Sequence, residues 1–246
     1  MPFTFSHPAI ILPLSKVSKT KLSLTGLITG SLAPDFEYFI CLQMRRTYGH
    51  DMNSFFWFNL PLCVGLAFIF HMFVKAPLTN SLPRFLYMRL VKYIHFNWFL
   101  YFKTYWIVFI YSAAIGVFSH LLWDSFTHDH GIFGKSPAIL FRQIPIINIP
   151  LFYFLQWLST IFGALTIMRT IYNLPIEMVP KSPLPIKNMY WLHVLTIMCF
   201  IFIVEQPTGI SGLIAVTIGS FLYGIVGSSI FLKIYEKIYS NRNIKL

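Results

Sequence analysis

Three polar residues, His120, Asp124 and His128, stand four positions apart at the end of an apolar stretch, Tyr105–Trp123. Residues four apart lie on one face of a helix, so this spacing places two imidazoles and a carboxylate in one column. Imidazole and carboxylate groups are ligands that zinc-type cations take from proteins. An ionisable group in a membrane segment costs about 2.5–3.5 kcal/mol at the centre on insertion scales, so it needs a partner or a purpose. The pattern predicts a metal site.

The composition is that of an integral membrane protein. The chain has 246 residues, of which 56% are hydrophobic and only 11% charged, with a mean hydropathy of +0.65. Four or five windows meet or approach the about 20 apolar residues that a bilayer core requires. Pro61 lies inside the first window, so a kinked or re-entrant helix is an alternative there to a straight crossing. The windows are Ser54–Val74, Thr104–Trp123, Pro150–Met168, Tyr190–Val204 and Ile210–Tyr235.

These windows predict an all-α fold, a polytopic helical membrane bundle of about five transmembrane helices with further N-terminal and interfacial helices. The loop segment Arg84–Phe102 mixes aromatic and basic residues, as an interfacial helix does. Pro180, Pro183 and Pro185 exclude a continued helix between the third and fourth windows. We expect one membrane domain, 1–246, made of a ligand-bearing segment (1–53), the first two spans with the metal motif (54–130) and the remaining spans (131–246).

The charge distribution points to a bilayer as the partner. The net charge of +11 comes from Lys and Arg scattered through loops and the C-terminal tail, which favours membrane anchoring over nucleic-acid binding. The loops opposite the N-terminal segment carry more basic residues, which favours a cytoplasmic C-terminus and an outer N-terminal segment. Met1–Leu14 has no basic start or small-residue cleavage site, so we expect it to be retained. Cys41, Cys63 and Cys199 are too widely spaced for a disulfide framework or a cysteine metal site.

Two further candidate ligands lie beside prolines in the N-terminal segment. A proline restrains the residue before it to an extended conformation and can itself begin a helix. We therefore expect His7 at the mouth of a helix that begins at Pro8, and Asp35, after Pro34, at a break between two helices. If the first two windows cross in opposite directions, all candidate ligands finish on one side of the membrane. These are His7, Asp35, His50, Asp51, His120, Asp124, His128, Asp129 and His130.

Three segments resemble a known family. They read PFTFSHP from Pro2, GSLAPDFEYF from Gly30 and SHLLWDSFTH from Ser119. They look like the bacterial membrane family filed as domain of unknown function 4184. The resemblance covers most of the chain and is tightest over residues 1–130. That family is similar in motif to bacterial inner-membrane metal-dependent hydrolases, and its ligand order is distantly similar to zinc-dependent phospholipase C and the fungal single-strand zinc nucleases.

The resemblance implies which residues carry metal: His7, Asp35, His50, His120 and Asp124, with Asp124 as a bridge between two ions. The helical spacing adds His128 as a candidate. Family members show Ser-His-Ser or Ser-His-Thr where this chain has Gly49-His50-Asp51. The secreted phospholipases and nucleases have further ligands downstream, where this chain offers only His193, inside a window. We therefore expect one or two ions, of zinc or alternatively manganese.

The first functional interpretation is an enzyme, a metal-dependent hydrolase of the phosphoesterase type in the bacterial inner membrane. Its substrate would be a phospholipid or another anionic phosphoester at one membrane face. The candidate catalytic residues are Asp124, Glu37 and Asp51, the last two as general bases or as partners that orient an imidazole. The alternative is a non-enzymatic protein, either a scaffold whose polar cluster fixes helix packing or a transporter. A transporter places charge near the midplane of several spans, and the last three windows hold almost none.

Overall fold

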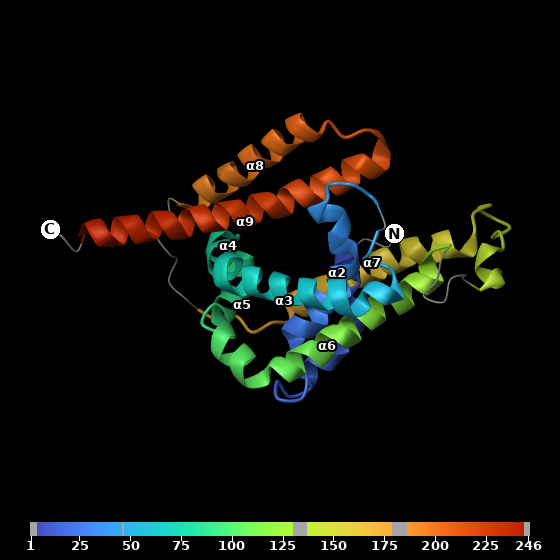
Figure 1. The fold of residues 1–246 in the computed structure, drawn as a ribbon, viewed down its shortest axis with the longest axis horizontal. Coiled ribbons are helices and arrows are strands. Elements are labelled where there is room, and N and C mark those ends of the chain that lie inside the picture. The colour runs from blue at the N-terminus through green and yellow to red at the C-terminus, as the bar shows by residue number, and fades with distance from the viewer. Residues whose placement is uncertain (1–3, 46, 130–136, 179–185, 244–246) are drawn as a thin grey trace. The chain divides into compact units, whose positions relative to one another are not determined.

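The apolar stretches of the sequence form long helices (Figure 1). The computed structural model describes residues 4–45, 47–129, 137–178 and 186–243. Across these ranges the regular structure is helical, and no β-strand occurs. The α-helices are α1 (Pro8–Ile11), α2 (Leu24–Ile40), α3 (Leu60–Ile69), α4 (Lys75–Ser81), α5 (Arg84–Leu90), α6 (Trp98–Thr127), α7 (Leu151–Tyr172), α8 (Ile186–Glu205) and α9 (Gly209–Asn243).

Within the described residues, five helical stretches have the length and hydropathy needed to cross a membrane. An all-α membrane bundle with five spans is therefore confirmed, and the chain is an integral membrane protein. The five stretches are Met52–Ser81, Trp98–Thr127, Leu151–Tyr172, Asn188–Glu205 and Gly209–Ile238.

The first span is longer than its apolar window. Helical structure continues through π-helical turns at Phe55–Asn59 and Phe70–Val74, on either side of α3. Pro61 is the second residue of α3, in the first turn of the helix, where a proline is tolerated, and the helical stretch continues through it. The re-entrant alternative is not needed, because the helical stretch that contains Pro61 is long enough to cross the bilayer.

The prediction of an interfacial helix over Arg84–Phe102 is wrong for the second half of this segment. Only α5, Arg84–Leu90, is a separate short helix, and α6 already begins at Trp98. The apolar residues after Trp98 extend the second span by one and a half turns, and Tyr105 marks the join with a non-helical φ of −125° and ψ of 30°. The expected loop around Pro180, Pro183 and Pro185 falls outside the residues that the structure describes.

The helix break expected at Pro34 is also wrong. Helix α2 runs from Leu24 to Ile40 with Pro34 inside it. A proline in a helix interior costs about 3 kcal/mol. That cost is offset by the packing of apolar residues of α2, since Leu27, Ala33, Tyr38 and Phe39 are buried. Asp35 therefore projects from a continuous helix whose position is fixed by packing.

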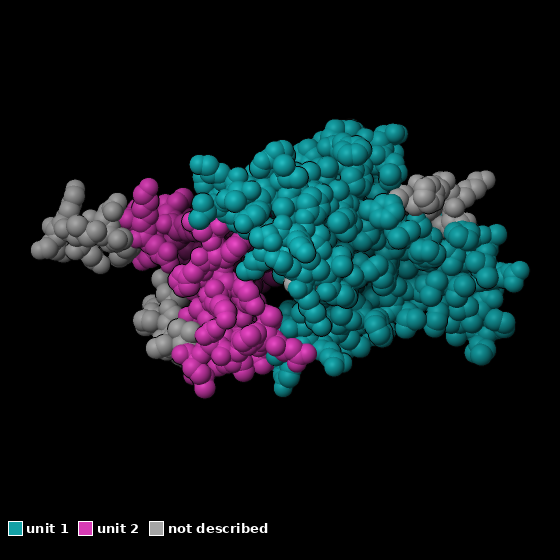
Figure 2. All heavy atoms as spheres, turned by 90° about the horizontal axis from the view of Figure 1, so that it is seen from below, with its two compact units in different colours: residues 1–37, 46–67, 99–172 teal, residues 38–45, 68–98, 173–246 magenta. Residues whose placement is uncertain are grey.

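The contacts divide the chain into two compact units, each assembled from three separate segments (Figure 2). Unit 1 consists of Met1–Glu37, Arg46–Ala67 and Phe99–Tyr172, and unit 2 of Tyr38–Arg45, Phe68–Trp98 and Asn173–Leu246. The candidate ligands predicted from the sequence, from His7 to His128, all belong to unit 1. The expectation of one membrane domain stays a prediction.

The core of unit 1 is a buried stripe along α6 that changes from apolar to polar. Phe109, Ala113 and Val117 are fully buried at the helical spacing of four, and the same face continues to His120 and Asp124. The apolar part of this stripe holds α6 against its neighbours, which places the polar part inside the unit.

The N-terminal segment of unit 1 packs on α7. The short helix α1 begins at Pro8, as predicted, with His7 directly before it. The Ser6 hydroxyl donates to the Thr160 carbonyl of α7 over 3.1 Å. A Cβ on Gly163 would stand only 2.5 Å from the Ser6 Cβ, so the glycine lets the two backbones meet closely. This contact fixes the position of His7, the next residue.

Unit 2 contains α4, α5, α8 and α9. Helices α8 and α9 form an antiparallel hairpin (Figure 1) in which Tyr190, Val194 and Leu232 are buried. The indole of Trp191 donates to the Ser81 carbonyl at the end of α4 over 2.9 Å. These contacts are those of a packed helical core.

Candidate metal centre

Helices α2 and α6 cross at unusually short range, and the crossing sets the geometry of the centre. A Cβ added to Gly30 would lie 2.2 Å from the Ala113 carbonyl oxygen, and one added to Gly116 would lie 2.4 Å from the Leu27 oxygen. Only glycine permits this approach, as in small-residue contacts between membrane helices. The helices continue from the crossing to Asp35 and His120, so these side chains meet because the backbones touch.

The His120 ring is oriented by the backbone of α2. Its Nδ1 lies 2.7 Å from the Ser31 carbonyl oxygen, which can only accept, so Nδ1 is the donor. In the neutral ring this hydrogen bond leaves the lone pair on Nε2. That atom lies 3.7 Å from Asp35 Oδ1 and 3.5 Å from Asp124 Oδ2. A backbone carbonyl behind the ring is the usual support of a metal-ligating histidine.

Asp35 is fully buried and uses its two oxygens differently. Oδ2 accepts a 2.6 Å hydrogen bond from the Thr4 hydroxyl, whereas Oδ1 faces the imidazoles of His120 and His50. Burial alone would raise the pKa of this carboxyl, but the charges of His120 and His50 outweigh burial, and the pKa lies below its ordinary value. The carboxylate form is thus the favoured one inside the protein.

His50 reaches the centre from a loop that Glu37 holds in place. The buried Glu37 carboxylate accepts hydrogen bonds from the backbone N–H groups of Thr47, Tyr48 and Gly49, at 2.7–3.0 Å. The Asn59 side chain donates to the Gly49 carbonyl over 2.9 Å. A Cβ on Gly49 would lie 2.1 Å from the Pro34 oxygen, so the loop lies directly on α2. Glu37 therefore secures the backbone next to His50.

Four side chains form a compact set of ligand atoms, which we call the four-residue centre: Asp35, His50, His120 and Asp124. One ligand atom from each lies within 4.8 Å of the others. His50 Nε2 lies 3.3 Å from both Asp35 Oδ1 and Asp124 Oδ2. A tetrahedral zinc with bonds of about 2.0–2.1 Å separates its ligand atoms by about 3.3–3.4 Å. Four of the six pairs of residues are separated by 3.3–3.7 Å, which fits such an ion, and the other two pairs lie within 4.8 Å.

His7 and His128 lie on the other oxygen of Asp124. His7 Nε2 is 3.5 Å from Asp124 Oδ1, and His128 Nδ1 is 3.3 Å from the same oxygen. The His7 ring also stacks on the His120 ring, with centroids 3.8 Å apart. All six residues predicted from the sequence as metal ligands therefore lie together in unit 1.

The electrostatics of the centre favour a cation. Among the described residues, the two buried carboxylates form ion pairs with histidines alone. Burial would lower the pKa of His50, but Asp124 and Asp35 outweigh it and raise that pKa to about 9. Burial, reinforced by the charge of His120, lowers the pKa of His7 to about 3. Without a metal, His50 therefore carries a proton that balances one of the two carboxylates, and a divalent cation would take the place of that proton, with His7 remaining neutral.

Several of the buried polar atoms without a hydrogen-bond partner face the centre. They include Nε2 of His120, Oδ1 of Asp35 and both carboxylate oxygens of Asp124. A buried polar atom without a hydrogen bond costs about 1–3 kcal/mol. Coordination to a metal ion would satisfy all of them at once, so the residues present fit a metal.

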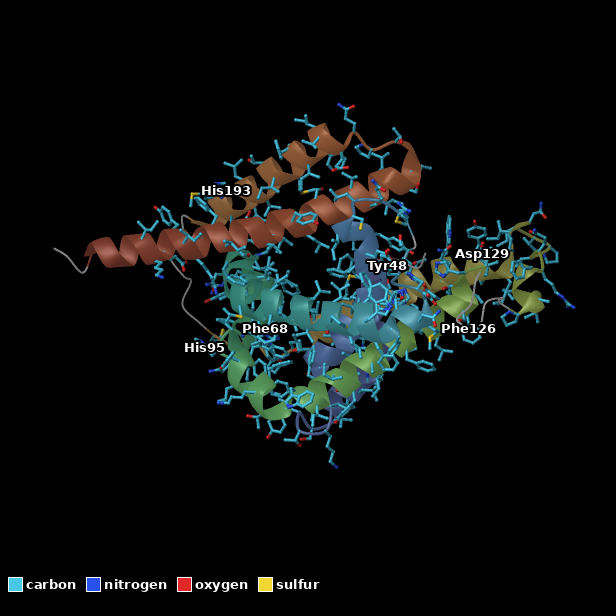
Figure 3. The ribbon with its side chains drawn as sticks, viewed as in Figure 1. Tyr48, Phe68, His95, Phe126, Asp129 and His193 are labelled. Atoms are coloured by element: carbon cyan, nitrogen blue, oxygen red, sulfur yellow. The ribbon has the colours of Figure 1, made fainter. Side chains whose placement is uncertain are left out.

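The other acidic candidates have different positions. Asp51 is exposed and caps the turn Met52–Ser54 by accepting from the Asn53 N–H. Asp129 is exposed after the end of α6, next to Phe126 in the view of Figure 3, and His130 falls outside the described residues. The assignment of Glu37 and Asp51 as general bases stays a prediction. In the structure, both carboxylates accept hydrogen bonds from backbone N–H groups. His71, His95 and His193 belong to unit 2 and are not members of the centre.

Sequence reasoning missed the partners that position the ligands. Thr4, Asn59 and the Ser31 carbonyl are not metal ligands, and a backbone acceptor leaves no trace in a residue pattern. One signal was available, however. Gly26 and Gly30 form a glycine pair four apart, the spacing at which membrane helices approach closely.

Comparison with known proteins identifies the family of this chain but does not identify an activity. No curated protein and no solved structure matches the chain. One family model matches residues 1–236, which is nearly the whole chain. The resemblance expected from the three sequence motifs is therefore confirmed at the level of the family, and the chain belongs to the family described as Domain of unknown function (DUF4184).

Proposed function

We propose that this protein is a membrane-embedded, metal-dependent hydrolase of the phosphoesterase type. Its substrate class is an anionic phosphoester, in the first place a phospholipid-like molecule, at one face of a bacterial inner membrane. The proposal rests on one observation above all: buried carboxylate and imidazole atoms from three separate segments converge at the spacing of metal ligands. Zinc is the first candidate because its preferred donors are present, and manganese is the alternative.

Each side chain has a distinct role in the proposed chemistry. A bound divalent cation would polarise a phosphoryl oxygen and make a water nucleophile accessible near neutral pH. Asp35 and Asp124 supply the negative charge that holds the cation, and His50 and His120 complete its coordination. Thr4 and Ser31 keep Asp35 and His120 in orientation through their hydrogen bonds.

The depth of the centre supports a substrate from the membrane. Helix α6 has 30 residues, so its length is about 45 Å, against about 30 Å for the hydrocarbon core. His120 and Asp124 lie in its last two turns and therefore near one membrane face. Exposed aromatic side chains occur at the same end of unit 1, among them Tyr48 and Phe126 (Figure 3). Such residues are typical of the headgroup region, where a lipid phosphoester lies.

The decisive measurement is the metal content of the detergent-purified protein by mass spectrometry. We expect about one or two equivalents of zinc or manganese per chain, the range set by the ligands present. Asp35→Ala and Asp124→Asn should lose metal, because each removes a buried charge that the cation needs. When the metal is lost, the rate of hydrolysis of phospholipid vesicles and of a chromogenic phosphodiester should fall by at least about 100-fold. The reason is that a metal ion supplies several kcal/mol of transition-state stabilisation.

An exposed carboxylate provides the matched control. Asp129→Asn removes the same charge outside the centre and should keep both metal and activity. The alternative functions predict other results for Asp124→Asn. A scaffold would lose only stability, and a transporter would lose flux without any dependence on metal. Absence of metal from the reconstituted wild-type protein would end the hydrolase proposal.

A further inference from the structure

Two lysines of unit 2 lie inside candidate spans and come together from neighbouring helices. Lys75 is the first residue of α4, in the first span, and Lys233 belongs to α9, in the last span. Helix α4 contacts α9, and the two ammonium groups are close enough for their charges to repel each other. A charge in a membrane span is costly and needs a partner or a purpose. Two like charges side by side add to that cost.

The two lysines lie at the same depth in the membrane. Lys75 follows Met52, where the first span begins, by 23 residues. Lys233 follows Gly209, where the last span begins, by 24 residues. At 1.5 Å per residue both lengths are about 35 Å, against about 30 Å for the hydrocarbon core. The first and last of the five candidate spans cross in the same direction, so both ammonium groups reach the headgroup region of one membrane face.

Uncharged groups of unit 2 hold each ammonium in position. Nζ of Lys75 donates to the Phe96 carbonyl oxygen over 2.7 Å and lies 5.7 Å from the centroid of the Phe96 ring. Nζ of Lys233 donates to the Met72 carbonyl oxygen and lies 5.8 Å from the centroid of the Phe73 ring. Carbonyl oxygens and ring faces attract a cation but do not neutralise its charge.

The pair of lysines is therefore suited to an anion. Within the part of the chain that the structure describes, no carboxylate forms an ion pair with either lysine, and this includes Glu236 on the next turn of α9. An ammonium group has three donors, and each lysine uses one of them for a backbone carbonyl. A phosphate group supplies both the negative charge and several acceptor oxygens.

The surroundings of the lysines favour the phosphate of a lipid over a free phosphate ion. Exposed apolar side chains border the pair on both helical stretches, and in a membrane span such side chains face acyl chains. An inorganic phosphate gains nothing from them, whereas a phospholipid brings acyl chains together with its phosphate. The side chains are those of Phe70, Met72, Phe73, Ile230 and Ile234.

We propose that Lys75 and Lys233 bind the headgroup phosphate of an anionic phospholipid at the membrane face where the first and last spans end. Basic pockets between membrane helices bind acidic headgroups in this way. The lipid neutralises two charges that repel each other and so joins α4 to α9. It is a bound partner of unit 2 and not a substrate of the metal centre, so the inference does not depend on the proposed function.

Native mass spectrometry of the full chain in a neutral detergent tests the site by titration with phosphatidylglycerol. Wild-type protein should retain one tightly bound lipid. Lys75→Gln and Lys233→Gln should each weaken its binding by about fivefold or more, the factor that one lysine contributes near an anionic headgroup. Phosphatidylcholine has the same phosphate but no net charge, so it should bind to the wild type more weakly by at least the same factor.

An exposed lysine of another span provides the matched control. Lys103 lies near the start of α6, and Lys103→Gln removes the same charge without touching the site, so it should keep the wild-type affinity. Far-UV circular dichroism checks that each variant is folded. Lys233 is exposed, whereas Lys75 is buried, so Lys233→Gln serves if Lys75→Gln does not fold.

A competition with sodium phosphate, against sodium chloride at the same ionic strength, separates the two sources of phosphate. Retention of phosphatidylglycerol in both salts supports the lipid site. Binding of inorganic phosphate without any retained lipid would overturn it. Equal affinity for phosphatidylglycerol in the wild type and both site variants would also overturn it, because apolar contacts alone would then hold the lipid. An equal loss in Lys103→Gln would do the same, since it would show a general effect of charge.

Discussion

At the scale of single residues, the centre consists of ligands and of residues that hold them. His120 has the Ser31 carbonyl behind its ring, Asp35 has the Thr4 hydroxyl, and the loop of His50 has Glu37. Glu37 is the least expected of these partners, because a buried carboxylate near a metal centre suggests a general base. Its oxygens are instead directed at three backbone N–H groups.

Substitution of Glu37 distinguishes these two roles. In Glu37→Gln the amide has one accepting oxygen, so the loop loses charge-assisted hydrogen bonds worth about 1.5–3 kcal/mol each. If Glu37 positions His50, metal affinity should fall by about 10–100-fold, as for other partners of metal ligands. Isothermal titration with zinc measures this affinity. A large loss of turnover at unchanged metal affinity would instead assign Glu37 to proton transfer, and Asp129→Asn serves as the exposed control.

The ligands could be predicted from the sequence, but their supports could not. His120, Asp124 and His128 follow from helical spacing, because the period of a helix fixes which side chains share a face. His7 and Asp35 were singled out by the prolines beside them and His50 by the expected topology, and the family resemblance then implied all three as ligands. Ser31 acts through its carbonyl, which every residue has, and Asn59 has no spacing relation to the ligands.

At the scale of elements, the crossing of α2 and α6 determines whether the centre exists. Pro34 suggested a helix break because the intrinsic cost of proline was weighed without the burial of its neighbours. In the folded chain α2 continues through Pro34 and delivers Asp35 from a rigid helix. Tertiary packing therefore keeps α2 helical where the local preference of proline predicted a break. The glycines of the crossing are part of that packing.

A methyl group at the crossing should separate the two helices. Gly30→Ala places a Cβ at 2.2 Å from the Ala113 carbonyl oxygen, and overpacking of this kind costs about 1–3 kcal/mol. The shift would move Asp35 away from Asp124, so we expect a lower unfolding temperature and weaker zinc binding. Gly65→Ala is the matched control, because a Cβ there meets no atom within 4 Å. Equal effects of the two substitutions would contradict the role of the crossing.

At the scale of the whole molecule, the five candidate spans among the described residues put the segments before the first span and after the last span on opposite sides of the membrane. The excess of basic residues on the side of the C-terminus favours its cytoplasmic location. The metal centre, at the end of α6 that follows the second crossing, would then face the outer side. Under the proposed function, this orientation would give the centre a substrate from the outer leaflet.

Cysteine labelling in intact cells tests the orientation. In a background without native cysteines, Asp129→Cys should react with a membrane-impermeant maleimide added from outside. Lys92→Cys, exposed on the opposite side of the second span, should react only after the membrane is permeabilised. The reverse pattern would place the metal centre at the cytoplasmic face, and the substrate would then come from the inner leaflet.

The contact of Ser6 with Thr160 joins residues 154 positions apart, which has a consequence for biosynthesis. At about 5–20 residues per second, the ribosome makes Thr160 roughly 8–31 s after Ser6. During that interval the N-terminal segment is in the membrane without its helical partner, and His7 cannot yet be held against Asp124. The N-terminal segment can therefore take its packed position beside the candidate centre only once the third span has been made. Under the proposed function, a chain released before that point would lack this side of the centre.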